Sequence, residues 1–123
     1  MSNSERRERG RRIAEQWGGG PRSEPTITEK ASPEFWDMTL EHVWCDVWGR
    51  PGLGLREREM ITIASIISLG NPGGGLKAHL RNAANVGVKR EEILEIIMHV
   101  AHYAGWPAAT DALNQYYEVF KPK

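Results

Sequence analysis

The sequence has very little cysteine. Cys45 is the only one among 123 residues, so a single chain cannot form an internal disulfide, a two-cysteine redox centre or a multi-thiolate metal site. The neighbours of Cys45 include Trp44, Val47 and Trp48, which are all apolar. We therefore interpret Cys45 as a buried, small hydrophobic residue and not as a nucleophile.

An excess of charge of either sign is also missing. The 16 lysines and arginines balance 16 aspartates and glutamates, so the formal net charge is zero. Nucleic acids and anionic membranes attract proteins through a basic excess, so neither is predicted as a partner. One local cluster of arginines near the N-terminus is interrupted by glutamates, which favours a solvated amphipathic helix over a nucleic-acid arm. Its members are Arg6, Arg7, Arg9, Arg11 and Arg12.

Long apolar runs are the third absence. A membrane-spanning helix needs about 18 to 20 consecutive apolar residues, and a signal peptide needs an apolar stretch near the N-terminus. The sequence shows neither pattern. Its 40% hydrophobic residues over 123 positions suit one hydrophobic core. We therefore predict a single cytoplasmic domain over residues 1–123 with no membrane partner.

Glycine and proline are abundant, and they divide the chain into segments with helical patterns. The 13 glycines and 7 prolines cluster at positions that helices rarely cross. Between the clusters, apolar residues recur three and four positions apart, without the alternation of a strand. The pattern predicts an all-α fold, a compact bundle of about six helices joined by turns and one polar linker over 18–31. The expected helices cover 5–17, 33–48, 56–69, 76–86, 90–104 and 107–120.

The second and third expected helices carry the clearest core pattern. In the second, Trp36, Leu40, Val43 and Val47 recur at helical spacing and are predicted to face the core. The third has an apolar arc that is too wide for a surface helix. A monomer of 123 residues has little room to bury so much apolar surface, so we predict a homo-oligomer.

Four histidines are candidates for proton transfer near neutral pH: His42, His79, His99 and His102. His79 lies three residues after Leu76, which places it on or beside the buried face of its helix, one turn beyond a glycine-rich break. Such an imidazole can meet a ligand, or it can be a hydrogen-bonded core histidine. Both interpretations stay open at this point.

Two further groups have weaker patterns. Glu95, His99 and His102 are spaced as metal ligands on a helix can be, but a solvated or subunit-facing stripe explains them better, so no metal is predicted. Arg50 and Arg58 offer the rigid forks that suit a carboxylate. Trp44 and Trp48 can form the wall of a pocket for a planar ring or belong to the core. Glu59 can pair with Arg58 along the helix surface.

With these residues in view, the chain resembles the carboxymuconolactone decarboxylase family, within the wider alkylhydroperoxidase D-like superfamily. The order and spacing of several segments carry the resemblance over almost the whole chain. They are Val47-Trp48-Gly49-Arg50-Pro51-Gly52-Leu53, Arg56-Glu57-Arg58-Glu59, Leu76-Lys77-Ala78-His79-Leu80 with Ala83, Asn85 and Gly87, Glu91-Glu92-Ile93-Leu94-Glu95, and Tyr103-Ala104-Gly105-Trp106-Pro107-Ala108-Ala109. The peroxidase branch has a Cys-x-x-Cys pair where this chain has Pro72 and Gly75, which points to the decarboxylase branch.

The resemblance implies a cofactor-free loss of carbon dioxide from 4-carboxymuconolactone, giving 3-oxoadipate enol-lactone. It implies His79 as general acid or oxyanion donor, with Glu59 orienting it. The predicted substrate-binding residues are Arg50, Arg58, Trp44, Trp48 and His99. Family members commonly form trimers or hexamers, so the same is expected here. Another proton-transfer or ring-forming reaction on a biosynthetic intermediate, or non-catalytic binding of small acids, stays an alternative because a fold does not fix a substrate.

Overall fold

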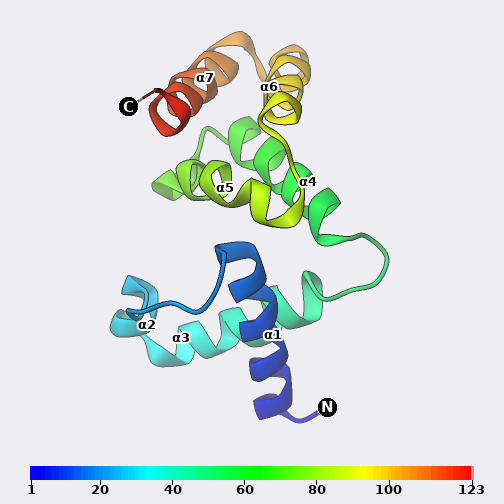
Figure 1. Ribbon diagram of the computed structural model, residues 1–123, viewed down its shortest axis with the longest axis vertical. Helices are drawn as coiled ribbons and strands as arrows, with labels where there is room; N and C mark the ends of the chain where they lie inside the picture. The colour runs from blue at the N-terminus through cyan, green and yellow to red at the C-terminus, as the bar shows by residue number, and fades with distance from the viewer. Residues whose placement is uncertain (123) are drawn as a thin grey trace. The chain divides into compact units, whose positions relative to one another are not determined.

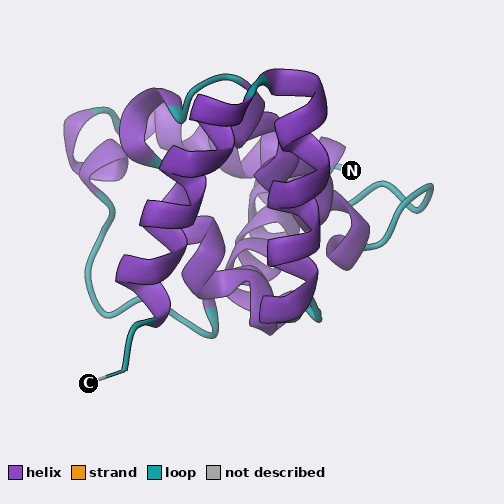
Figure 2. Ribbon diagram, turned by 90° about the horizontal axis from the view of Figure 1, so that it is seen from above, coloured by secondary structure: helices purple, strands orange, loops and turns teal. Residues whose placement is uncertain are grey.

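The computed structural model describes residues 1–122, and within them it contains helices and loops but no strand (Figure 2). The predicted all-α fold is confirmed. The chain forms two compact units, residues 1–55 and residues 56–123, and each is described by itself below. Within residues 1–122, no helix is both long and apolar enough to span a bilayer. Because the chain divides into two units, the expectation of one domain over residues 1–123 stays a prediction.

Helix α1, Asn3–Gly18, opens the first unit. Ser2 and Glu5 form a capping box at its start, and it ends at Gly19 in the left-handed conformation. A short helix follows, α2, Ile27–Ala31, inside the segment predicted as a linker, so that prediction was wrong here. Thr26 caps α2 through the backbone N–H of Glu29. Five residues are too few to give a recognisable helical period.

The segment expected as one helix over 33–48 consists of two forms of helix. Helix α3, Pro33–Met38, leads into the π-helix η1, Thr39–Val47. The wider turns of η1 appear in the bond from Trp48 N to Val43 O, which joins residues five apart at 2.9 Å. This spacing buries Leu40, Trp44 and Trp48, whereas Val43 and Val47 are each 39% exposed. The prediction that both valines face the core was wrong because it assumed an α-helical period.

Helix α1 packs against η1 at very short range (Figure 1). A Cβ atom on Gly10 would lie only 1.9 Å from the backbone oxygen of Leu40, so only glycine fits at this crossing. The ring centroids of Trp17 and Trp44 are 5.4 Å apart, and those of Trp44 and Trp48 are 5.0 Å apart. The first unit is therefore built around an aromatic cluster that α1 covers.

The N-terminal arginines have two kinds of surroundings. Arg6 and Arg7 form ion pairs with the carboxylates of α3 and η1, among them Asp46 and Glu41. Arg12 pairs with Glu8 of its own helix at 3.7 Å and is exposed. The interpretation as a solvated helix face is confirmed for Arg12, whereas Arg6 and Arg7 serve to attach α1 to its neighbours.

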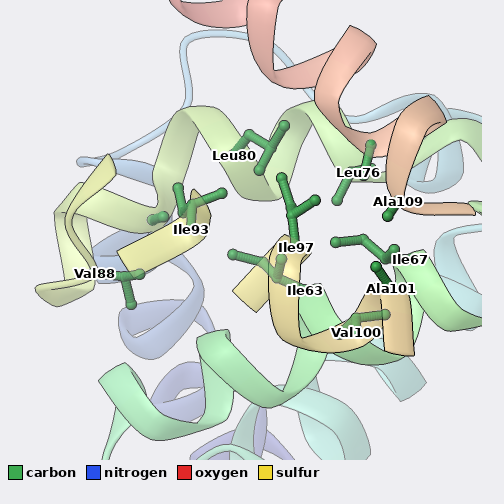
Figure 3. Packing of buried hydrophobic residues seen from close by; sticks show 12 residues of the cluster. Ile63, Ile67, Leu76, Leu80, Val88, Ile93, Ile97, Val100, Ala101 and Ala109 are labelled. Atoms are coloured by element: carbon green, nitrogen blue, oxygen red, sulfur yellow. The ribbon is translucent and has the colours of Figure 1, made fainter. Parts of the chain in front are cut away.

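The second unit consists mainly of four α-helices around an aliphatic core. They are α4 (Leu55–Ser68), α5 (Leu76–Asn82), α6 (Arg90–Ala104) and α7 (Trp106–Phe120), and the short 3-10 helix η3 (Ala83–Val86) follows α5. All of these bounds lie within about one residue of the predicted ones once η3 is counted with α5. Figure 3 shows how α4, α5, α6 and α7, together with Val88 in the loop before α6, contribute to the core: Ile63, Ile67, Leu76, Leu80, Val88, Ile93, Ile97, Val100, Ala101 and Ala109.

The glycine-rich break before α5 is a structured turn. Pro72–Gly74 form a short 3-10 helix, η2, and Asn71 precedes it with a φ of 58°, in the left-handed region. Asparagine tolerates this conformation because its short polar side chain bonds locally. The Oδ1 atom of Asn71 accepts a hydrogen bond of 2.9 Å from the backbone N–H of Leu76. Asn71 therefore fixes the start of α5.

Candidate active site

The second unit brings Glu59 and His79 into direct contact, although they are 20 positions apart in the sequence. Glu59 lies on α4 and His79 on α5. The Nδ1 atom of His79 is 2.6 Å from Oε1 of Glu59. His79 lies between Leu76 and Leu80, which face the core, so its ring reaches α4 beside the buried face, as its spacing predicted.

The burial of this pair is very unequal. The side chain of Glu59 is 0% exposed, whereas 18% of the His79 side chain is exposed. A carboxylate oxygen accepts hydrogen bonds, so Nδ1 of His79 is the donor, and this bond sets the orientation of the ring. The arrangement is a carboxylate-oriented imidazole of the kind used in acid–base catalysis.

Arg58 precedes Glu59 on α4 and is half-buried. Its backbone oxygen accepts a hydrogen bond of 2.7 Å from the hydroxyl of Thr62. Glu59 is fully buried, so it does not lie on the solvated surface of the helix, where the sequence analysis placed a pairing with Arg58 as an alternative. The role of Arg58 in holding a carboxylate stays a prediction.

Three other predicted substrate-binding residues belong to the first unit. Trp44 is 9% exposed and Trp48 is 8% exposed, and both pack in the aromatic cluster beside Trp17. The structure therefore gives them the core position that the sequence analysis left open as an alternative. Arg50 is exposed, and its backbone N–H donates to Val47 O at 3.2 Å. The substrate contacts of all three stay predictions.

His99 lines a separate open groove along α4 and α6, with a volume of about 660 Å³. The residues around this groove include Met60, Glu95 and His102, and they do not include Glu59 or His79. Nδ1 of His102 donates to the backbone oxygen of Met98 at 2.9 Å. Among residues 1–122, no three His, Cys, Asp or Glu side chains gather closely enough to hold a metal ion. A substrate contact by His99 stays a prediction.

The contacts of Arg9 with the backbone near the end of η1 were not predicted from the sequence. Its guanidinium donates to two backbone oxygens near the end of η1, those of Cys45 and Gly49. Cys45 and Gly49 lie 36 and 40 positions after Arg9 in the sequence, so no local pattern reveals these contacts. Cys45 is buried and free, as predicted.

Comparison with known proteins agrees with the all-α fold. A sequence profile of the carboxymuconolactone decarboxylase family matches residues 33–117. The chain belongs to the carboxymuconolactone decarboxylase family. The predicted family resemblance is thereby confirmed, and the matched region contains both Glu59 and His79.

Two relatives are similar over most of this chain. A 4-carboxymuconolactone decarboxylase from Acinetobacter baylyi is 40% identical over 88 residues, which are 72% of this chain and 65% of the relative. A nitrosuccinic acid decarboxylase from Metarhizium robertsii is 36% identical over 83 residues, 63% of this chain and 53% of the relative. The matches thus span less than two thirds of either relative's length.

Proposed function

We propose that this protein is a decarboxylase that releases carbon dioxide from a lactone acid of the 4-carboxymuconolactone type. The observation that carries the proposal is the contact between Nδ1 of His79 and the buried carboxylate of Glu59. Membership of the carboxymuconolactone decarboxylase family and the similarity to two proteins named as decarboxylases support it. The proposed product from 4-carboxymuconolactone is 3-oxoadipate enol-lactone.

The reaction asks little of the protein beyond placement, charge stabilisation and one proton. The bond between the ring carbon and its carboxylate breaks, carbon dioxide leaves, and the electron pair passes through the unsaturated lactone to its carbonyl oxygen. A proton then returns to carbon, and water replaces the proton that the donor has lost. Holding the substrate, stabilising the oxyanion and delivering this proton are the tasks for side chains.

His79 is the residue we assign to the last two tasks. The imidazole of His79, oriented by the bond from Nδ1 to Glu59, is the group that donates to the oxyanion or to carbon. Glu59 acts through His79, so it is a positioning residue that keeps one tautomer and one ring orientation. Arg58, next to Glu59 on α4, is the proposed partner for a substrate carboxylate in this unit.

The similarity to a nitrosuccinic acid decarboxylase favours a second candidate, the decarboxylation of a nitro acid. When a carboxylate leaves a carbon that carries a nitro group, the electron pair passes to the nitro oxygens. A proton then returns to carbon as it does in the lactone. The same donor therefore serves either substrate, and the pocket decides between them.

The test compares carbon dioxide release from 4-carboxymuconolactone and from nitrosuccinic acid, and then replaces His79. The substitution His79→Gln keeps an amide N–H for Glu59 but provides no acid of suitable strength. We expect kcat to fall about 1000-fold, because a positioned acid–base group contributes about 10² to 10⁴. The helical circular dichroism spectrum should stay unchanged.

The matched control is His102→Gln, the same substitution at an exposed histidine of α6. It should leave kcat within about twofold of wild type. Equal kcat values for His79→Gln and wild type would contradict the role of His79. Release from nitrosuccinic acid alone would transfer the proposal to the second candidate, and release from neither acid would refute both.

We also propose that the chain forms a homo-oligomer. Several large apolar side chains of α6 and α7 are exposed in the described chain, including Met98 at 53%, Trp106 at 69% and Tyr117 at 66%. Exposed apolar surface of this kind is typical of subunit contacts. Sedimentation velocity measures the assembly, and a monomer at micromolar concentration would contradict the proposal. A trimer or hexamer is the expected form.

A further inference from the structure

The segment that carries His79 is held to α4 at its far end by Arg56. Helix α5 continues through η3 to Gly87, where a φ of 90° ends it. The Nε atom of Arg56, in the first turn of α4, donates to the backbone oxygen of Gly87 at 3.2 Å. The last carbonyl groups of a helix lack partners within it, and a charged donor makes a strong hydrogen bond to them. Arg56 therefore joins the end of η3 to the start of α4.

The same guanidinium also holds the start of α6. Its Nη2 atom pairs with Oε2 of Glu92, and Oε1 of Glu92 accepts a hydrogen bond of 3.0 Å from the backbone N–H of Lys89. The bonds from Lys89 and from Arg56 hold the pKa of Glu92 below its ordinary value, so its carboxylate is ionised at neutral pH. The rigid fork of an arginine suits two partners at once. Arg56 thus holds the chain on both sides of the loop between Gly87 and Lys89.

Arg56 and Glu59 lie three positions apart on α4, so their side chains leave neighbouring points of the helix surface. Glu59 contacts His79, and Arg56 contacts Gly87, eight residues further along the chain. A segment held at one point can turn about that point, whereas two points fix both its register and its rotation. The bond to Gly87 is therefore a second fixed point for the segment that presents His79 to Glu59.

We propose that Arg56 is a positioning residue for His79: by holding Gly87 and Glu92 at the first turn of α4, it keeps the imidazole in register with Glu59. This inference rests on the proposed function, in which His79 delivers the proton. Arg56 acts through the position of His79, so its loss should slow the chemical step and leave KM nearly unchanged.

The first test measures kcat and KM for 4-carboxymuconolactone. We expect Arg56→Ala to lower kcat about tenfold and to change KM less than about twofold, because a displaced acid is a poorer donor. Arg56→Lys should lower kcat about threefold, since an ammonium group keeps a charge opposite Glu92 but has no fork to hold Gly87 as well. Circular dichroism shows that each variant is folded.

Two controls lie on α5 itself. Arg81→Ala makes the same substitution at an exposed arginine two positions after His79. Lys77→Ala removes the ion pair that joins α5 to Glu118 of α7 and leaves the contacts of Arg56 in place. Both should keep kcat within about twofold of wild type. The second control separates the loss of the contact with α4 from a general loosening of α5.

A double variant distinguishes positioning from a purely structural role. In the His79→Gln background, adding Arg56→Ala should change kcat by less than about twofold, because its effect passes through an imidazole that is already absent. A purely structural role, which only reduces the amount of folded protein, would lower kcat by the same factor with and without His79.

A second measurement needs no substrate. In nitrogen-15-labelled protein, the Nδ1 proton that His79 donates to Glu59 can be followed by NMR. Its exchange with water should become about tenfold faster in Arg56→Ala, because the hydrogen bond opens more often. Exchange should stay at the wild-type rate in Arg81→Ala and Lys77→Ala.

Each outcome decides the proposal. A fall in kcat that is confined to the Arg56 variants and absent without His79, together with faster proton exchange, supports it. Wild-type kcat or unchanged exchange in folded Arg56→Ala overturns it, and so does an equal fall in kcat for Lys77→Ala. If Arg56→Ala does not fold, the same two measurements on Arg56→Lys decide. If the wild-type protein releases no carbon dioxide, the proposed function fails, and proton exchange alone still shows whether Arg56 positions His79.

Discussion

The two units of this chain contain different kinds of interior. In residues 1–55, Leu40, Trp44 and Trp48 are buried. The charged groups of this unit lie nearer the surface, where ion pairs join α1 to α3 and η1. In residues 56–122, the core is aliphatic, yet it contains the fully buried carboxylate of Glu59. In the first unit, charged side chains hold helices together by ion pairs near the surface. In the second unit, the carboxyl group of Glu59 occupies a core position that an aliphatic side chain would fill at lower cost.

The difference indicates where function lies. Burying a carboxylate costs several kcal/mol of desolvation, and its interaction with a neighbouring group at best offsets that cost. The contact with His79 explains why the second unit contains one. Exposed pairs such as Arg6 with Asp46 add little stability individually and need no functional explanation.

The largest effect on stability is expected for Glu59→Ala. This substitution leaves a cavity in the aliphatic core and removes the partner of His79, so the free energy of unfolding should fall by about 4 kcal/mol. Urea unfolding followed by far-ultraviolet circular dichroism measures it. Glu57→Ala, at an exposed position two residues earlier, should cost less than about 1 kcal/mol.

A double variant, Glu59→Leu with His79→Leu, sharpens the comparison further. It should recover most of the lost stability, because replacing a buried pair with apolar side chains is often neutral or stabilising. It should have no decarboxylase activity. If Glu59→Ala is no less stable than Glu57→Ala, the buried carboxylate does not distinguish the interior of the second unit from that of the first.

The next effect is expected in the first unit, for Gly10→Ala. The new Cβ atom would lie 1.9 Å from the backbone oxygen of Leu40, so α1 must move away from η1. We expect a loss of about 3 kcal/mol, at the upper end of overpacking effects. Four of the 5 tryptophans, at positions 17, 36, 44 and 48, lie in this unit, so tryptophan fluorescence follows its unfolding.

The control for this prediction is Gly18→Ala on the same helix. No atom lies within 4 Å of a Cβ added to Gly18. Alanine also favours helix more than glycine does, so the stability should be unchanged or slightly higher. A similar loss for both variants would show that the close crossing at Gly10 is unimportant.

The smallest effect is expected from the exposed pair of Arg6 and Asp46. Its hydrogen bond from Arg6 holds the pKa of Asp46 below its ordinary value. A lowered pKa in the folded state means that the contribution to stability is present above the ordinary value and is lost as the pH falls through the lowered value. The stability of the first unit, measured by fluorescence, should therefore decrease below about pH 4.

Arg6→Ala should weaken this pH dependence, because the carboxyl of Asp46 then titrates near its ordinary value. Part of the dependence should persist, because backbone and side-chain hydrogen bonds from Ser2 lower the pKa of Glu5 in the same unit. An identical slope for Arg6→Ala and wild type between pH values of about 6 and 3 would contradict the assignment to Asp46.

Much of the fold could be predicted from glycine, proline and the helical period. Gly87 and Gly105 end helices with φ values of 90° and 109°, and both ends were predicted from the sequence. The π-helix η1 could not be predicted, because its tryptophans and valines also fit an α-helical pattern. The exposure of Val43 and Val47 depends on hydrogen bonds that only the folded backbone shows.

The candidate site was predicted in part. The position of His79 on its helix followed from spacing, and family resemblance paired it with Glu59. The burial of Glu59 did not follow from the sequence, because Arg56, Glu57 and Arg58 beside it suggest a solvated first turn. Contacts between distant positions, such as that of Arg9 with Gly49, depend on tertiary packing that no local pattern contains.

The close crossing of α1 and η1 also shows that the region matched by the family is shorter than the first unit needs to bury its core. The family match begins at residue 33, whereas α1 ends at Gly18. A fragment starting at residue 33 would contain the whole match but would lack the helix that covers Leu40, Trp44 and Trp48. The segment that must be present to bury these tryptophans is therefore longer than the segment that the family match covers.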